Sequence, residues 1–252
     1  MRPLAAAELL DLWEQGLSVP LVTRTLLLLT QACSDTTRDA LARLPIGHRD
    51  ALLLKLREWT FGPRLDSVVD CPQCGERLEI TLDISDLLTT AGEAPPETLF
   101  LQAEGYRVSY RLPNSYDLMA LVDTENPEAR LQALLGRCLI EARSLVETGD
   151  DEQAEPALAL DQLPEPVVAA MRQQMSEADP LGDIRFALAC PSCDHRWSAL
   201  FDIVSFFWRE IDDWARRTLR EVHSLGRAYG WSEADILTLS AWRRRAYLEM
   251  IA

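Results

Sequence analysis

Two short cysteine motifs constrain the fold of this 252-residue chain more than any other feature of its sequence. The first is Cys71-Pro-Gln-Cys74-Gly and the second is Cys190-Pro-Ser-Cys193-Asp. Each motif, called a knuckle below, places two thiols on a tight turn, and two such turns supply the four sulfur ligands of a tetrahedral structural zinc site. We therefore predict one zinc ion bound by Cys71, Cys74, Cys190 and Cys193, with no open coordination position for catalysis.

The sequences that follow the two knuckles repeat each other. Arg77 and Arg196 stand at the same spacing from the first cysteine of each motif, and Asp83-Ile84 matches Asp202-Ile203. Each copy reads as strand, knuckle, strand and helix start. The repeat predicts two equivalent halves that meet as one zinc ribbon. Because common ribbons separate their knuckles by only about 15–20 residues, a sizeable segment must be inserted between these two.

Two other uses of paired cysteines have to be weighed, a redox dithiol and a disulfide framework. A redox motif stands once, near a βαβ unit, whereas these motifs stand twice between predicted strands. The other two cysteines, Cys33 and Cys138, lie in helical apolar patterns and are expected to be buried thiols. His195 is expected at a strand edge rather than as a metal ligand. This cysteine usage favours a reducing compartment, and hence a cytoplasmic location.

Composition restricts the class of partner. An apolar content of 48% with 26% charged residues is that of a globular protein. The net charge of −15 opposes nucleic-acid binding, which depends on neutralising phosphates. The longest apolar stretch, residues 17–33, is interrupted by polar residues and is shorter than the roughly 20 residues of a membrane span. We expect no nucleic acid, no membrane segment and no secretory signal.

Four helices are predicted before the first knuckle, over residues 8–14, 21–33, 36–43 and 48–60. Ser34 or Asp35 is the expected cap of the third. The fourth carries an apolar stripe and ends at Phe61-Gly62-Pro63. Its charged residues are expected on the solvent face; they are Arg49, Asp50, Arg57 and Glu58.

The pattern then changes to the two-residue period of strands. Strands are predicted on both sides of the first knuckle, followed by a loop at residues 91–96 and a hairpin of residues 99–103 and 106–112. Pro113-Asn114-Ser115 is expected to start a helix.

The rest of the chain is predicted to be mainly helical. Apolar residues from Leu118 to Leu139 indicate a helical pair interrupted at Asn126-Pro127, and a further helix is expected at 166–178. The stretch 147–165, acidic and without a basic residue, is expected to be a solvated, mobile loop. After the second knuckle a long helix is predicted from Ser205 to Tyr229, ended by Gly230, then a Ser232–Asp235 capping box and a last helix over 241–250.

Together these patterns predict an α+β fold that is mainly helical, with a small antiparallel zinc-ribbon unit and N-terminal, inserted and C-terminal helices. We divide the chain into five regions: an N-terminal helical region (1–65), the first ribbon half with the hairpin (66–112), an inserted helical region (113–184) with the acidic loop at 147–165, the second ribbon half (185–203) and the C-terminal helices (204–252).

No catalytic constellation is recognisable. A phosphate-binding loop, a GxSxG elbow and an HExxH helix are all missing from the sequence. We predict neither catalytic residues nor an organic cofactor. Arg243, Arg244 and Arg245 in the last helix could be read as a DNA-binding face, but on an acidic protein they are expected to face solvent or another protein. Trp208, Trp231 and Trp242 are the candidate aromatic contact residues if a helical surface is exposed.

Several segments together resemble one family, the baseplate hub assembly chaperones of T-even-type phages, with relatives encoded beside contractile phage tails and phage-like contractile injection systems. The cysteine knuckles resemble the injection-system branch. The segments that carry the resemblance are Leu44–Leu54, Glu58–Gly62, Cys71–Arg77, Tyr110–Leu118, His223–Glu233 and Arg243–Ile251.

The resemblance implies a non-enzymatic assembly or baseplate protein in the producing cell, stabilised by structural zinc, that holds or docks hub, spike or tail-tube proteins. It fixes no oligomeric state. Two alternatives remain: a zinc-ribbon adaptor that binds nucleic acid or transcription machinery, and a zinc-dependent or redox enzyme.

Overall fold

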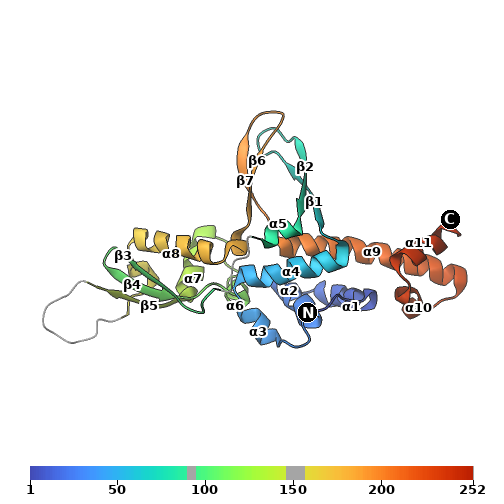
Figure 1. Cartoon of the computed structure of the whole chain (residues 1–252), viewed down its shortest axis with the longest axis horizontal. Helices are drawn as coiled ribbons and strands as arrows, with labels where there is room; N and C mark the ends of the chain where they lie inside the picture. Colours follow the sequence, from blue (N-terminus) through green and yellow to red (C-terminus); the bar gives the residue numbers. More distant parts are fainter. Residues whose placement is uncertain (90–94, 146–156, 252) are drawn as a thin grey trace.

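The structure is a computed structural model that describes residues 1–89, 95–145 and 157–251. It has an elongated helical body from which two β-hairpins rise together, a sheet-containing part at one end and a long helix running to the other end (Figure 1). The described residues form helices α1 to α11 and three small antiparallel sheets. The predicted α+β, mainly helical class is therefore confirmed.

The body is built from the N-terminal helices and the start of the longest helix. These are α1 (Ala6–Gly16), α2 (Leu21–Ala32), α3 (Arg38–Arg43), α4 (Ile46–Phe61) and α9 (Ile203–Tyr229). Their apolar faces enclose the first hydrophobic core, whose fully buried members include Leu29, Leu54, Leu56 and Phe207. The helix α3 starts later than predicted because its cap is Thr37 rather than Ser34 or Asp35. The side-chain oxygen of Thr37 accepts a hydrogen bond from the amide N–H of Ala40.

The charged residues of α4 are not on a solvent face. Arg49, Asp50 and Arg57 are only 2%, 8% and 3% exposed, and Glu58 is half-buried. The prediction was wrong because α4 lies in the middle of the body, packed against α2, α9 and the 3-10 turn η2 (Pro180–Asp183). Burial of these charges is tolerated because each arginine is ion-paired.

A second core lies in the inserted part. The strands β3 (Leu99–Ala103), β4 (Tyr106–Tyr110) and β5 (Leu139–Ser144) form an antiparallel sheet in that order. The helices of this part are α6 (Ser115–Ala120), α7 (Pro127–Cys138) and α8 (Glu165–Ala178), and residues of α7 and α8 pack with the sheet. The predicted hairpin is confirmed, and Glu104 and Gly105 at its turn both have positive φ.

The segment after α7 is a strand, which differs from the prediction. Leu139 was expected to continue a helix, but α7 ends at Cys138 and Leu139 begins β5, which pairs with β4. A strand whose partner lies almost 30 residues earlier leaves little local signal, and pairing with β4 overrides the helical pattern.

The prediction for 147–165 is wrong where the structure describes that stretch. Leu160 and Leu163 are buried in the second core, and Leu160–Gln162 forms a 3-10 turn, η1, directly before α8. Residues 146–156, and residues 90–94 of the loop predicted at 91–96, lie outside the described part of the chain.

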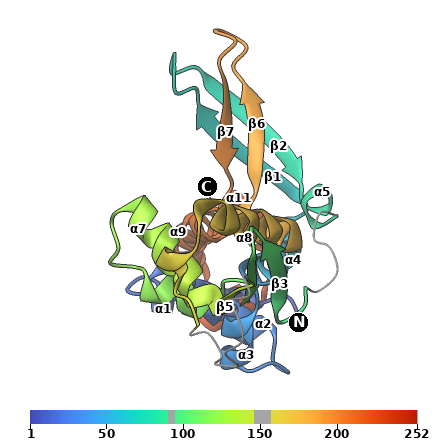
Figure 2. The ribbon, with the colours of Figure 1, turned by 90° about the vertical axis from the view of Figure 1, so that its left-hand side faces the viewer.

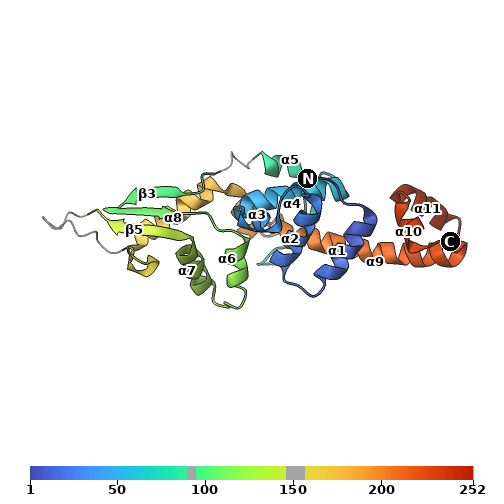
Figure 3. The same cartoon turned by 90° about the horizontal axis from the view of Figure 1, so that it is seen from below.

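The C-terminal helices follow the predicted order. The helix α9 begins at Ile203 rather than Ser205, because Asp202 accepts the amide N–H groups of Val204 and Ser205. Gly230 ends it with φ +70°, and the Ser232–Asp235 capping box starts α10 (Glu233–Thr238). The last helix is α11 (Ala241–Glu249) (Figure 3). Among the described residues, no helix is both long and apolar enough to cross a membrane.

Candidate metal centre

Two β-hairpins stand side by side on top of the body (Figures 1 and 2). The first consists of β1 (Arg64–Asp70) and β2 (Arg77–Asp83), and the second of β6 (Arg185–Ala189) and β7 (Arg196–Leu200). We call these two hairpins the hairpin pair. Each hairpin is a separate two-stranded sheet. Because an isolated two-stranded hairpin is marginally stable in water, the hairpin pair needs other contacts to hold it.

The two knuckles form the turns of the two hairpins and have the same hydrogen bonds. The amide N–H of Cys71 donates to the backbone carbonyl of Glu76 at 2.8 Å. The amide N–H of Cys190 donates to the backbone carbonyl of His195 at 2.9 Å. Gly75 has φ +74° and Asp194 has φ +56°. Glycine adopts this left-handed conformation without steric cost, and aspartate does so more readily than most residues. The knuckles are thus equivalent turns, as the internal repeat predicts.

The repeat continues into the helices below. Asp83 at the end of β2 accepts the amide N–H of Ser85 at 2.9 Å and starts α5 (Ile84–Leu88). Asp202 takes the same place after β7 and accepts the amide N–H of Val204 at 2.9 Å, starting α9. Ile84 and Ile203, next to the caps, are both buried in the first core. Each hairpin is therefore anchored in the body by the helix that follows it.

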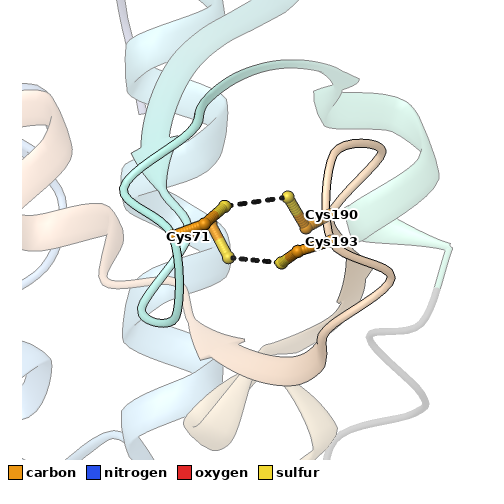
Figure 4. Close-up of side chains that lie close together, drawn as sticks. Cys71, Cys190 and Cys193 are labelled. Atoms are coloured by element: carbon orange, nitrogen blue, oxygen red, sulfur yellow. Dashed lines mark hydrogen bonds between the residues drawn. The ribbon is translucent and has the colours of Figure 1, made fainter.

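The four knuckle cysteines converge between the hairpin tips. Figure 4 shows three of them, Cys71, Cys190 and Cys193, facing one another. The sulfur of Cys71 lies 3.7 Å from that of Cys193, and the sulfur of Cys74 lies 3.6 Å from that of Cys190. All four sulfur atoms lie within 4.8 Å of one another. Zinc–sulfur bonds of about 2.3 Å in a tetrahedron place the sulfur atoms about 3.8 Å apart. The residues present therefore fit a four-sulfur metal site.

The same distances exclude disulfide bonds between the knuckles, since a disulfide requires sulfur atoms about 2.05 Å apart. All six cysteines lie in the described residues and are unbonded. Cys71 and Cys190 are buried, Cys193 is half-buried and Cys74 is exposed.

The crowding of the sulfur atoms has an electrostatic consequence. Burial acts to raise the pKa of Cys71, but the backbone N–H groups of Cys74 and Gln73 and the neighbouring thiols lower it to about 7. For Cys193, the backbone N–H of His195 acts to lower the pKa, but burial and the three neighbouring thiols raise it to about 12. Four thiols this close cannot all lose their protons unless a cation neutralises them, and a bound metal ion supplies that charge.

The remaining sulfur and imidazole groups stay outside this cluster. The imidazole of His195 stacks on the Trp197 ring, with ring centroids 5.8 Å apart, and does not join the four sulfur atoms. Cys33 and Cys138 are buried in the two cores, and burial raises the pKa of Cys138 to about 12. Both are packing residues, as expected.

The candidate aromatic contact residues are placed very differently. Trp208 is only 7% exposed and packs in the first core under the guanidinium of Arg24, so it is not available as a contact residue. Trp231 is half-buried and stacks on Tyr229. Trp242 is 79% exposed.

The three arginines of the last helix are not equivalent. Arg244 is buried, donates to the carboxylate of Glu221 at 3.0 Å and to the carbonyl of Leu239 at 2.8 Å. Only Arg243 and Arg245 are exposed, so the three do not form one basic face.

The sequence interpretation missed one residue at the foot of the hairpin pair. The guanidinium of Arg57 donates to the carbonyls of Gly62 and Arg64, at 2.6 and 2.5 Å, where α4 gives way to β1. The available signal was its position inside a leucine-rich segment, which ordinarily indicates burial.

A comparison with protein families identifies one match. The family model described as "T4 bacteriophage base plate protein" matches residues 21–208, from the start of α2 into the first turns of α9. Comparisons with curated proteins and with solved structures gave no match. The matched residues form most of the chain and include both knuckles. On this evidence, the chain belongs to the T4 bacteriophage base plate protein family.

Proposed function

We propose that this protein is a non-enzymatic assembly factor or structural component of a contractile, phage-tail-like baseplate, acting in its hub or spike region. The single observation that carries the proposal is the family match over residues 21–208, which supports a structural baseplate component. The narrower placement at the hub or spike follows from the resemblance carried by Leu44–Leu54, Tyr110–Leu118 and the other segments named above.

A structural zinc ion is part of this proposal. Cys71, Cys74, Cys190 and Cys193 would hold it, and their sulfur spacing and thiol chemistry both suit a tetrahedral zinc ion. The ion supplies a crosslink between two hairpins that belong to separate sheets. With four protein ligands no position remains for a substrate, which supports a structural rather than a catalytic role.

The recess at the start of α4 agrees with a non-enzymatic role. The recess beside His48 and Asp179 at the start of α4 has a volume of about 20 Å³, which is room for one water molecule and not for an organic substrate. The partners we propose are other baseplate proteins, namely hub, spike or tail-tube proteins, met in the cytoplasm of the producing cell and in the particle.

The alternative of a nucleic-acid adaptor is not favoured. The net charge of −15 opposes binding to phosphates, and the buried Arg244 is already paired with Glu221.

Gene deletion in the producing cell tests the proposal. We expect purified particles from the deletion strain to lack complete baseplates in electron micrographs, and the wild-type gene supplied in trans to restore them. Mass spectrometry of wild-type particles then shows whether the protein is retained. Its presence identifies a structural component, and its absence identifies an assembly factor that leaves the particle. Normal, contractile tails in the deletion strain would refute the proposed function.

A further inference from the structure

The chain ends in an arm that lies outside the residues matched by the family model, although His223–Glu233 and Arg243–Ile251 belong to the resemblance described above. We call residues 214–251 the C-terminal arm; it comprises the later part of α9 together with α10 and α11. Figures 1 and 3 show α9 continuing past α1, with α10 and α11 at its far end. The matched family residues stop at 208.

The C-terminal arm is an ordered structure with packing of its own. Tyr229, Trp231 and Tyr247 contact one another with ring centroids 4.6 to 5.7 Å apart, which fixes α11 against the end of α9. At the base, Ala215 and Leu237 are buried together with Leu10 of α1. The C-terminal arm therefore presents a preformed surface, which lowers the entropic cost of binding.

The charge of the C-terminal arm is opposite to that of the rest of the chain. Residues 214–252 contain seven arginines and four acidic residues, a net charge of +3. The body is nearly balanced, with seven basic and seven acidic residues in 1–63. The described residues of 64–202, which form the hairpin pair and the inserted part, contain 10 basic and 20 acidic residues, a net charge of −10; they are called the acidic part below. Such an asymmetry along one chain supplies complementary charges for an electrostatic contact.

The basic residues of α9 gather on one side of the helix. Arg216, Arg220, His223 and Arg227 follow one another at spacings of four, three and four, which places them on one helical face, and all four are exposed. Among the described residues, neither Arg220 nor Arg227 forms an ion pair with an acidic side chain. Arg216 pairs with Asp212 at 2.9 Å, so Arg220 and Arg227 are the uncompensated cations of this face.

The C-terminal arm also exposes large apolar side chains. Trp242 at the start of α11 is 79% exposed, and Met250 just after its end is 73% exposed. Tryptophan, methionine and arginine are the residues enriched in protein–protein interfaces, and tryptophan and arginine often dominate the binding energy. The combination is that of a docking surface for an acidic protein.

We infer that the C-terminal arm docks onto the acidic part of a second copy of this chain. The complementary charge lies on the same sequence, in the hairpin pair and the inserted part. Because the C-terminal arm points away from its own body (Figure 1), it reaches such a surface in another copy. Two acidic parts repel each other, so the contact joins the C-terminal arm of one copy to the acidic part of another. A contact of this head-to-tail kind repeats, giving a ring if it closes and a chain if it does not.

Sedimentation of the full-length, zinc-loaded protein tests the inference. We expect self-association that increases with protein concentration at about 50 mM salt and weakens at about 500 mM, because salt screens contacts between surface charges. The variant Arg216→Glu/Arg220→Glu/Arg227→Glu and, separately, Trp242→Ala should each raise the dissociation constant by about tenfold or more. The control Arg38→Glu/Arg172→Glu, at two exposed residues outside the C-terminal arm, should still associate.

A mixing experiment separates contact of the C-terminal arm with the acidic part from an arm-to-arm contact. A copy with the triple charge reversal has a defective arm but an intact acidic part, so an excess of it should bind wild-type protein and shorten the assemblies to dimers. An arm-to-arm contact predicts that this variant does not join wild-type protein at all. Circular dichroism confirms that each variant is folded.

Three results would overturn the inference. The wild-type protein could stay monomeric at every concentration at low salt. The arm variants could associate as strongly as wild type. The association could also disappear after nuclease treatment. The last result would assign the basic face to nucleic acid. None of these outcomes bears on the baseplate role, which the deletion experiment tests separately.

Discussion

Arg57 of α4 and Glu210 of α9 form a two-bonded ion pair at the foot of the hairpin pair. Nε and Nη2 of the arginine donate to the two carboxylate oxygens at 2.8 and 2.5 Å. The helix α4 leads into the first hairpin, and α9 follows the second. This pair therefore ties the two halves together at their base, as the four cysteines bring them together at the tips.

Removing the arginine should be costly. Arg57→Ala leaves Glu210 and the carbonyls of Gly62 and Arg64 without their donor, and breaking a buried ion pair typically costs about 3–5 kcal/mol. The expected loss in unfolding free energy is measured by urea denaturation. Arg64→Ala is the control, because Arg64 pairs with Asp66 on the surface and such pairs contribute about 1 kcal/mol or less. A cost for Arg57→Ala as small as the control would show that the two halves do not depend on this contact.

Gly47 should resist substitution because it lies against the turn η2. Its amide N–H donates to Asp179 at 2.8 Å, and a Cβ atom at this position would lie 2.2 Å from Asp179 Oδ1 and 2.7 Å from the amide nitrogen of Gly182. We expect Gly47→Ala to destabilise the protein by about 1–3 kcal/mol. Gly136→Ala in α7 is the control: no atom lies within 4 Å of its added Cβ, so it should be neutral or stabilise by up to about 1 kcal/mol. Thermal unfolding that ranks the two variants in the opposite order would contradict this packing.

The buried carboxyl group of Asp50 makes stability depend on pH. Burial raises its pKa from 3.8 to about 6, although the adjacent Arg49 acts to lower it. Because this pKa is higher in the folded than in the unfolded state, protonation of Asp50 stabilises the fold. The stabilisation is complete below the unfolded pKa of 3.8 and is lost as the pH rises through 6. From pH 7 to pH 4, wild type should therefore gain up to about 3 kcal/mol relative to Asp50→Asn. Urea denaturation of both proteins across this range measures the difference; a difference independent of pH would contradict the prediction.

Loss of one ligand should release the metal and loosen the hairpin pair. Cys190→Ser removes a sulfur ligand from the proposed zinc site, and structural zinc in small fingers binds with an apparent free energy of about 10–16 kcal/mol. We expect loss of bound zinc and faster hydrogen exchange in residues 64–83 and 185–200, while the helices of the body stay protected. Cys33→Ser, whose sulfur lies in the first core, should keep its zinc. Equal zinc content in both variants would exclude Cys190 as a ligand.

Features set by neighbouring residues could be predicted from the sequence. The two knuckles, the caps at Asn114 and Ser232 and the helix end at Gly230 depend on residues within a few positions, and the structure has them as predicted. The internal repeat extended this local information to the pairing of the two hairpins. The ion itself and its four ligands remain a proposal.

Features set by distant partners could not be predicted. Arg57 was expected on the surface because Glu210, which allows it to be buried, lies 153 positions away. Leu139 was expected in a helix because its strand exists only through pairing with β4. Leu160 and Leu163 were assigned to a solvated loop because acidic neighbours concealed two core positions. Tertiary contacts decided each of these cases.

X-ray absorption at the zinc edge, combined with metal analysis of the purified full-length protein, tests the central claim most directly. We predict one zinc ion per chain, surrounded by four sulfur atoms at about 2.3 Å. A protein that binds no metal, or a zinc ion with nitrogen or oxygen in its first coordination shell, would contradict a structural zinc ion held by Cys71, Cys74, Cys190 and Cys193.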